Sequence, residues 1–189
     1  MKMLKKLLAV VLTGAMALTL LTACGGNAVN DKNIADALND IVKSSVAAGL
    51  TKDYTFKPRT DEQAMAKAIA ALSEAEWNTK GDGDNKFSGP VMKILGLNEG
   101  GKNETSRFVW CGAVIADEIG TTGQAYNVMN NILSQKAANA DKLTGKEPGN
   151  IRYIGTALST MTYFGGKQTT VRIIVVTADA EDPQHPGKA

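Results

Sequence analysis

The chain has 189 residues, of which 43% are hydrophobic, and it carries a formal net charge of +2. This length is enough for one domain with a substantial core, and no repeat or second domain boundary is evident in the sequence. Only 5% of the residues are aromatic, and Lys and Arg form no stripe along the predicted elements. We therefore expect neither a nucleic-acid-binding surface nor a platform on which bases or sugars would stack.

The first 23 residues have the pattern of a secretory signal peptide. Lys2, Lys5 and Lys6 precede an apolar run over residues 7–21 that only Thr and Gly interrupt. The run is shorter than the roughly 20 apolar residues that span a bilayer, but it suits the apolar core of a signal peptide. Removal of residues 1–23 would leave 18 basic against 19 acidic residues, because it removes three lysines and no carboxylate. The mature chain would thus be close to neutral.

Residues 21–24 are Leu-Thr-Ala-Cys, and this sequence resembles the lipobox of bacterial lipoproteins. In that family the cysteine thiol is diacylated and the chain is cut just before the cysteine. The resemblance implies a lipid on Cys24, a flexible tether over residues 24–33 and an anchor on the extracytoplasmic face of a bacterial cell membrane. Two acyl chains are what stable anchoring requires. The alternative interpretation is a buried amphipathic helix in which a cysteine occurs by chance.

The first half of the chain after this segment has a helical pattern. Apolar residues at helical spacing predict a helix over residues 31–47, with its first residue as the cap. Residues 50–57 form a connector with some extended character. A second helix follows, and Thr60 with Gln63 three residues later matches a capping box. A short helix is predicted over residues 90–97.

The second half has the pattern of strands around one further helix. Residues 107–116 are predicted as the first strand, and residues 124–140 as the helix. Two strands follow over residues 151–162 and 168–178. They are joined by a turn at residues 164–167, whose Gly-Gly pair can supply the positive φ angles of a tight hairpin.

Residues 173–176 are four successive apolar residues, which predicts a strand that is covered on both faces. Because the rest of the chain is largely helical, we expect helices as the covers. The predicted fold is α+β, an α-β-α sandwich with a central antiparallel sheet that includes the C-terminal hairpin. A single globular domain is predicted over residues 34–178, followed by a polar tail over residues 179–189.

Candidate catalytic and metal-binding residues are few. With Cys24 acylated, Cys111 has no partner for an intrachain disulfide, and we predict it to be a small buried residue on a strand. A reactive thiol would need a nearby base, and the only histidine, His185, lies in the predicted tail. One histidine and one free cysteine do not make a metal site, and no cofactor fingerprint occurs. We therefore predict no metal, no cofactor and no catalytic residue.

Two pairs of neighbouring carboxylates are the remaining candidates for acid–base catalysis, Asp117 with Glu118 and Glu74 with Glu76. Residues one or two positions apart point in different directions on a strand or a helix, so nothing marks either pair as a general acid and base. An envelope hydrolase with an unrecognised carboxylate site is the alternative that these residues leave open.

Short segments over most of the mature chain share a further pattern. They are Leu38-Asn39, the Ala-Ala-Gly-Leu of residues 47–50, the Ala-rich helix of residues 64–72, Phe87-Ser88, the Gly-Ala-Val-Ile-Ala of residues 112–116, the helix that begins near Thr121, and Tyr153-Ile154-Gly155. Together they resemble bacterial SCP-like domains of the CAP superfamily. The resemblance implies an α-β-α sandwich with a cleft that the family lines with histidine and glutamate.

The chain departs from this family at the cleft. Gly89 stands where a histidine follows Phe-Ser, residues 112–116 lack the acidic and amide residues of Gly-Glu-Asn-Ile-Ala, and residues 137–139 lack the second histidine. A member without these residues would bind or scaffold rather than catalyse. We therefore expect a lipid-anchored binding module of the cell envelope that holds a small ligand, a peptidoglycan fragment or a protein partner. A structural component of an envelope complex is the other alternative.

Overall fold

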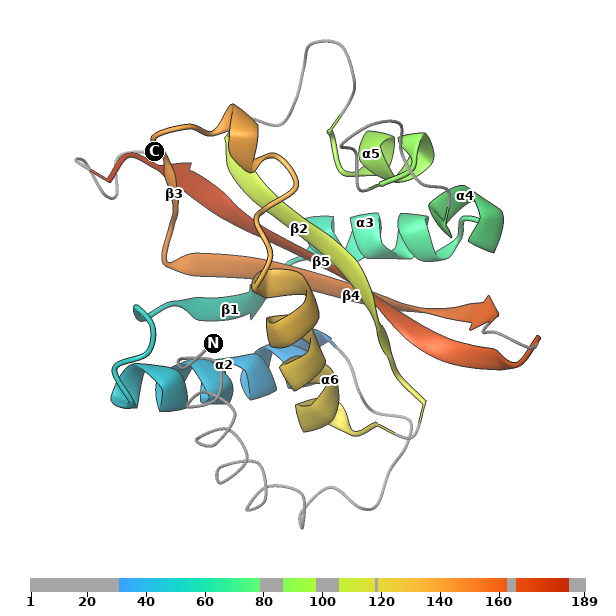
Figure 1. The fold of residues 1–189 in the computed structure, drawn as a ribbon, viewed down its shortest axis with the longest axis horizontal. Coiled ribbons are helices and arrows are strands. Elements are labelled where there is room, and N and C mark those ends of the chain that lie inside the picture. The colour runs from blue at the N-terminus through green and yellow to red at the C-terminus, as the bar shows by residue number, and fades with distance from the viewer. Residues whose placement is uncertain (1–30, 79–86, 98–105, 118, 163–165, 184–189) are drawn as a thin grey trace.

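The computed structural model describes residues 31–78, 87–97, 106–117, 119–162 and 166–183, which form helices around one sheet (Figure 1). The elements in chain order are α2 (Asp31–Ala47), β1 (Thr55–Pro58), α3 (Thr60–Ala70), α4 (Glu74–Asn78), α5 (Gly89–Ile94), β2 (Arg107–Ile115), α6 (Thr121–Val128), the π-helical turn η1 (Met129–Leu133), the 3-10 turn η2 (Ala140–Lys142), β3 (Glu147–Pro148), β4 (Ile151–Thr162) and β5 (Gln168–Glu181). The fold is α+β, as the sequence predicts.

The hairpin of β4 and β5 forms the centre of the sheet. The strand order is β1-β4-β5-β2, and the short β3 pairs with the far end of β5. β2, β3 and β4 are antiparallel to β5, whereas β1 runs parallel to β4. The prediction of an antiparallel sheet is therefore right for the pairs around β5 and wrong for β1. A short connector that pairs with a strand far along the chain leaves no local pattern from which its direction could be predicted.

The predicted hairpin is confirmed, with one difference at its end. β4 has the predicted bounds, and β5 begins where predicted but continues past the predicted end to Glu181. The N–H of Ala180 donates to the carbonyl of Ser106 at 2.8 Å, and the N–H of Gly149 donates to the carbonyl of Asp179 at 2.8 Å. The first residues of the predicted polar tail therefore belong to the sheet.

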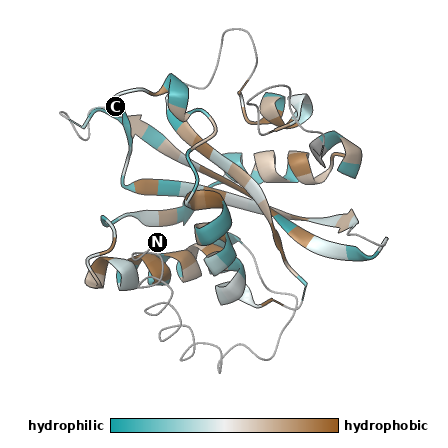
Figure 2. Ribbon diagram, in the orientation of Figure 1, coloured by the Kyte–Doolittle hydropathy of each residue, from teal (hydrophilic) through white to brown (hydrophobic). Residues whose placement is uncertain are grey.

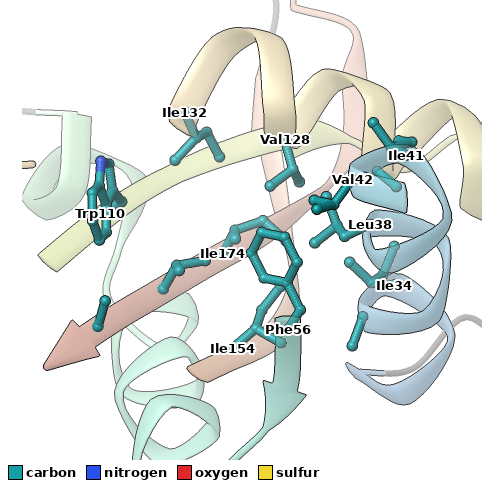
Figure 3. Close-up of a cluster of buried hydrophobic side chains, with 14 of the residues drawn as sticks. Ile34, Leu38, Ile41, Val42, Phe56, Trp110, Val128, Ile132, Ile154 and Ile174 are labelled. Carbon is teal, nitrogen blue, oxygen red and sulfur yellow. The ribbon is translucent and has the colours of Figure 1, made fainter. Parts of the chain in front are cut away.

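Alternate residues of β5 face two separate cores, which explains the run of apolar residues in this strand. Ile174 and Val176 lie in a core with residues of α2 and α6, whereas Ile173 and Val175 lie in a core with residues of α3 and α5. Figure 3 shows the first core, in which side chains from α2, α6 and the strands meet. Figure 2 shows that hydrophobic residues concentrate along the central strands and on α2. Helices therefore cover both faces of the sheet.

α3 approaches the sheet closely because Gly155 of β4 has no side chain. A Cβ at this position would overlap the backbone of Glu62 and Gln63 in α3. Towards the other end of the helix, the hydroxyl of Ser159 donates a hydrogen bond of 3.2 Å to the carbonyl of Ala70. These contacts lay α3 along β4 and place Glu62 directly over the sheet.

The helices differ from their predicted bounds at several ends. α2 has the predicted bounds, and its first three residues therefore belong to the helix rather than to the tether predicted over residues 24–33. Thr60 is the first residue of α3 rather than its cap, and the side chain of Gln63 donates to Asp31 at 2.8 Å instead of closing a capping box. The helix predicted over residues 124–140 is the shorter α6 followed by η1. Tertiary partners thus replace the local contacts that the sequence pattern favours. None of the described helices combines the length and the apolar character that crossing a membrane requires.

Candidate ligand-binding site

A cavity of about 250 Å³ lies beside β2, and we call it the β2 cavity. It is lined by residues 110–113 of β2, by Phe87 just before α5, and by Asn131, Ile132, Gln135, Lys136 and Ala138 of η1 and the turn that follows. In Figure 1, β2 crosses the view between α5 and α6. Three segments that are far apart in the sequence therefore meet at this one place.

β2 is an edge strand of the sheet, and its outer side is only partly covered. The N–H of Ala138 donates to the carbonyl of Val109 at 2.7 Å, and the N–H of Val109 donates to Asn139 Oδ1 at 3.1 Å. Every second residue of a strand presents its backbone groups to the same side, so those of Cys111 and Ala113 also point to this outer side. Neither residue finds a hydrogen-bond partner there within the described part of the chain.

The π-helical turn η1 shapes one wall of the β2 cavity. The N–H of Ser134 donates at 3.0 Å to the carbonyl of Met129, five residues earlier, which inserts an extra residue into the turn. Asn131 and Ile132 of this turn line the cavity. Gly112 makes room for Ile132, because a Cβ at Gly112 would lie 2.8 Å from Ile132 Cγ1. Turns of this kind are rare in proteins, and those that do occur are often found at functional sites.

The lining of the β2 cavity combines amides, apolar groups and one charged side chain. That charge is Lys136, whose side chain is exposed. The carbonyl of Gln135 accepts a hydrogen bond of 3.1 Å from Trp110 Nε1, and Gln135 Nε2 donates at 2.7 Å to the carbonyl of Asn131. No carboxylate or imidazole occurs among the described residues that line it. The helical spacing of the sequence places Asn131, Gln135 and Lys136 on the solvent-exposed face of the predicted helix. The sequence pattern therefore did not identify them as part of a site.

Cys111 lies on β2, as predicted, and its partly buried side chain packs against the core with α3 and α5. Burial raises the pKa of its thiol to about 12, although a hydrogen bond with the backbone of Gly112 opposes this. The thiol is therefore protonated at neutral pH and is a poor nucleophile. At the cavity it offers a soft, weakly polar surface rather than a reactive group.

The segments that carry the resemblance to the cleft of SCP-like domains meet at the β2 cavity. Phe87 precedes Gly89, where the resemblance implies the first histidine. Gly112 and Ala113 belong to the segment similar to Gly-Glu-Asn-Ile-Ala, and Ala138 lies where the second histidine is expected. In comparisons with known proteins, no family model, no curated protein and no solved structure matches this chain. The resemblance therefore rests on these residues alone.

Two buried polar networks lie outside the β2 cavity, and the first is centred on Glu62. Its fully buried carboxylate accepts hydrogen bonds from Arg59 Nε at 2.7 Å and from the hydroxyl of Thr177 at 2.7 Å. Arg107 Nη1 lies 3.7 Å from the same carboxylate, and the Arg59 guanidinium stacks 3.8 Å from the ring centroid of Tyr153. Burial alone would raise the pKa of Glu62, but the hydrogen bonds from Arg59 and Thr177 outweigh it and lower the pKa.

The second network joins α2 and α6 to the central hairpin. Asp31 accepts hydrogen bonds from the backbone N–H of Thr156 at 3.0 Å and from its hydroxyl at 2.6 Å. Arg172 donates to the Thr156 hydroxyl at 3.0 Å and to Gln124 Oε1 at 2.8 Å. Burial lowers the pKa of Arg172, and the nearby Asp31 opposes this shift. Because the charged groups of both networks are hydrogen-bonded, we interpret these networks as structural links between elements.

The described carboxylates of the two candidate pairs are each bonded to a neighbouring segment of the chain. Asp117 accepts hydrogen bonds from the backbone and hydroxyl groups of residues 169–170 at the start of β5. Glu74 accepts from the N–H of Thr162 at 3.0 Å, and Glu76 accepts from the residue just before α4. Each of these carboxylates therefore binds a backbone N–H. Their remaining partner, Glu118, lies outside the described residues.

The described residues contain no group of three or more His, Cys, Asp and Glu side chains that could hold a metal ion. Cys24 and His185 lie outside the described residues. Lipidation of Cys24 therefore stays a prediction that comes from the sequence pattern.

Proposed function

We propose that this protein is a lipid-anchored, extracytoplasmic protein of a bacterial cell envelope that binds a ligand or a partner in the β2 cavity without catalysing a reaction. The anchor is supported by the lipobox resemblance at Cys24 and by the signal-peptide pattern before it. The binding function rests on one observation. Amide side chains and the open backbone groups of Cys111 and Ala113 converge on one concave space, which is typical of binding sites.

We further propose that the domain is an SCP-like domain that has lost its cleft residues. Helices on both faces of the sheet support this proposal, and so does the meeting of the three matched segments at one cavity. Gly89, Ala113 and residues 137–139 stand where the resemblance implies the acid–base groups. A chain with small side chains at these positions keeps the space of the cleft but lacks groups that transfer protons.

The chemistry of the cavity favours binding over hydrolysis. General acid–base catalysis works best with groups whose pKa lies near the operating pH. The thiol of Cys111 has a pKa of about 12, and the carboxylates of Glu74 and Asp117 are bonded to backbone groups elsewhere. The hydrolase alternative would require a bell-shaped pH–rate profile that Asp117→Asn or Glu118→Gln abolishes. The alternative of a structural envelope component would require a stable complex after crosslinking.

The test compares two leucine variants of the mature lipoprotein in detergent. Ala113→Leu fills the β2 cavity, whereas Thr160→Leu adds the same side chain at an exposed position of β4 away from it. The probes are digested peptidoglycan and a proteolytic digest of envelope proteins. We expect a probe to raise the melting temperature of the wild type and of Thr160→Leu but not of Ala113→Leu. Equal shifts in all three proteins, or no shift with either probe, would contradict binding in the β2 cavity.

A further inference from the structure

We propose that the ligand of the β2 cavity is an extended peptide segment that bears a carboxylate and adds to the outer edge of β2 as a further strand. This inference rests on the proposed function, because it names the ligand class of the same site. In this mode of recognition, main-chain hydrogen bonds supply the affinity, and contacts with alternate side chains supply the selectivity.

The backbone of β2 determines the shape of the ligand. Val109 has its outward groups bonded to Ala138 and Asn139, so the edge is closed there. At Cys111 and Ala113 the outward N–H and C=O groups face the β2 cavity without a partner among the described residues. Each of these two residues presents one N–H donor and one C=O acceptor, and the two sets lie about 6.8 Å apart, the rise of two residues along a strand. A second extended backbone is the ligand that matches this repeat.

The open part of β2 lacks the features that usually prevent strand pairing. Natural edge strands are protected by charged side chains, by proline or by bulges. Residues 110–115 contain no charged residue and no proline. The pairing of β2 with β5 is continuous in register over its 9 residues, so this strand contains no bulge. The edge is thus left competent for pairing where the cavity adjoins it.

Lys136 determines the charge of the ligand. It is the one charged side chain among the described residues that line the cavity, and none of the ion pairs between described side chains includes it. A peptide with an acidic side chain or a free C-terminal carboxylate supplies the complementary charge. Asn131, which lies on the same wall, offers an amide for a side chain of the bound strand.

The free edge of β4 provides a contrast within the same sheet. Asp31 binds the outward N–H of Thr156, and Glu74 binds the outward N–H of Thr162, on either side of the exposed Leu158. Both of these N–H groups are therefore unavailable to a further strand at this edge. The acidic peptide is therefore expected to choose the edge of β2.

The first experiment is an affinity selection on the full mature lipoprotein in detergent. The probe is a pooled synthetic library of random hexapeptides with free C-terminal carboxylates, and bound members are identified by mass spectrometry. The selected peptides should bind the wild type and Thr160→Leu but not Ala113→Leu. Lys136→Gln should weaken them by about threefold to fivefold, the effect of one exposed ion pair. Lys142→Gln, at an exposed position outside the cavity, is the matched control and should not weaken them.

The second experiment measures backbone hydrogen exchange at the edge itself. The amides of Cys111 and Ala113 should exchange quickly in the free protein and at least about tenfold more slowly with a selected peptide. Two versions of a selected peptide can be made, with the odd-numbered or the even-numbered backbone nitrogens methylated. Only the version that loses the N–H donors facing β2 should fail to bind.

The outcomes separate the two proposals. If selected peptides require the cavity but leave both amides unprotected, strand addition is wrong while binding in the cavity stands. Ala113→Leu could instead leave hexapeptide binding unchanged but abolish the binding of digested peptidoglycan. In that case the ligand is not a peptide strand, and the proposed function stands. If neither hexapeptides nor the digests depend on the cavity, both proposals are wrong.

Discussion

The hydroxyl of Thr177 donates a hydrogen bond of 2.7 Å to the fully buried carboxylate of Glu62. This contact joins the first turn of α3 to the central strand β5. Arg59 binds the second carboxylate oxygen at 2.7 Å, so the charge is paired as well as buried. A buried carboxylate is tolerated when its oxygens are bonded in this way, and it becomes costly when a partner is lost.

Glu62→Gln should lower the free energy of unfolding by about 2 kcal/mol, because hydrogen bonds to a charged acceptor become bonds to a neutral amide. Glu147→Gln is the matched control, since Glu147 is exposed and has only a surface ion pair with Lys52, and it should leave the stability nearly unchanged. Chemical denaturation of the two variants measures both effects. Equal stability of the two variants would contradict a structural role for the buried carboxylate.

The same carboxylate predicts how stability depends on pH. The pKa of Glu62 in the folded protein lies below its ordinary value of 4.5. Such a group stabilises the fold at pH values above its unfolded pKa, and this contribution is lost as the pH falls through the folded pKa. The difference in unfolding free energy between the wild type and Glu62→Gln should therefore shrink below about pH 4.5. A difference that stays constant down to acid unfolding would show that the pKa is not lowered.

Gly155→Ala should destabilise the protein by about 3 kcal/mol, at the upper end of the cost of overpacking, because the new Cβ meets backbone rather than a mobile side chain. Gly89→Ala is the control, since nothing lies within 4 Å of a Cβ at that position. Thermal unfolding of both variants checks the prediction. A Gly155→Ala variant as stable as the control would mean that α3 does not lie against β4 as described.

Cys111 should react slowly with thiol reagents in the native protein. With a thiol pKa of about 12, only a very small fraction is thiolate at pH 8. In denaturant the pKa returns to about 8.5 and labelling becomes fast. Thr160→Cys in a Cys111→Ser background places a thiol at an exposed position of β4 and should react rapidly without denaturant. Native labelling of Cys111 at the rate of this control would overturn its assignment as an unreactive thiol.

Cys24→Ala should prevent lipidation and leave an uncleaved or soluble precursor. The expected result is loss of the protein from the membrane fraction, because the two acyl chains that supply stable anchoring are absent. Fractionation with detection of the precursor's size measures both consequences. If the variant still partitions with membranes and migrates as the mature protein, the lipobox interpretation is wrong.

Local patterns were sufficient for the central part of the fold. The Gly-Gly pair and the strand patterns on either side of it predict the bounds of β4 and the start of β5. The apolar run of residues 173–176 predicts that β5 is buried on both faces. The apolar spacing of α2 likewise predicts the face that packs in the core with Phe56 and Ile154. These features depend on residues within a few positions of one another, so the sequence contains them directly.

Contacts between distant segments determined the rest. Glu62 has the pattern of an ordinary residue at a helix start, but α3 lies against Gly155 of β4, and Thr177 of β5 binds the buried carboxylate. The direction of β1 and the loss of the capping box at Gln63 likewise depend on partners far along the chain. The β2 cavity exists because Phe87, the edge of β2 and η1 are brought together by packing. Hydrophobic periodicity records which face of an element is buried, but it does not record which elements meet there.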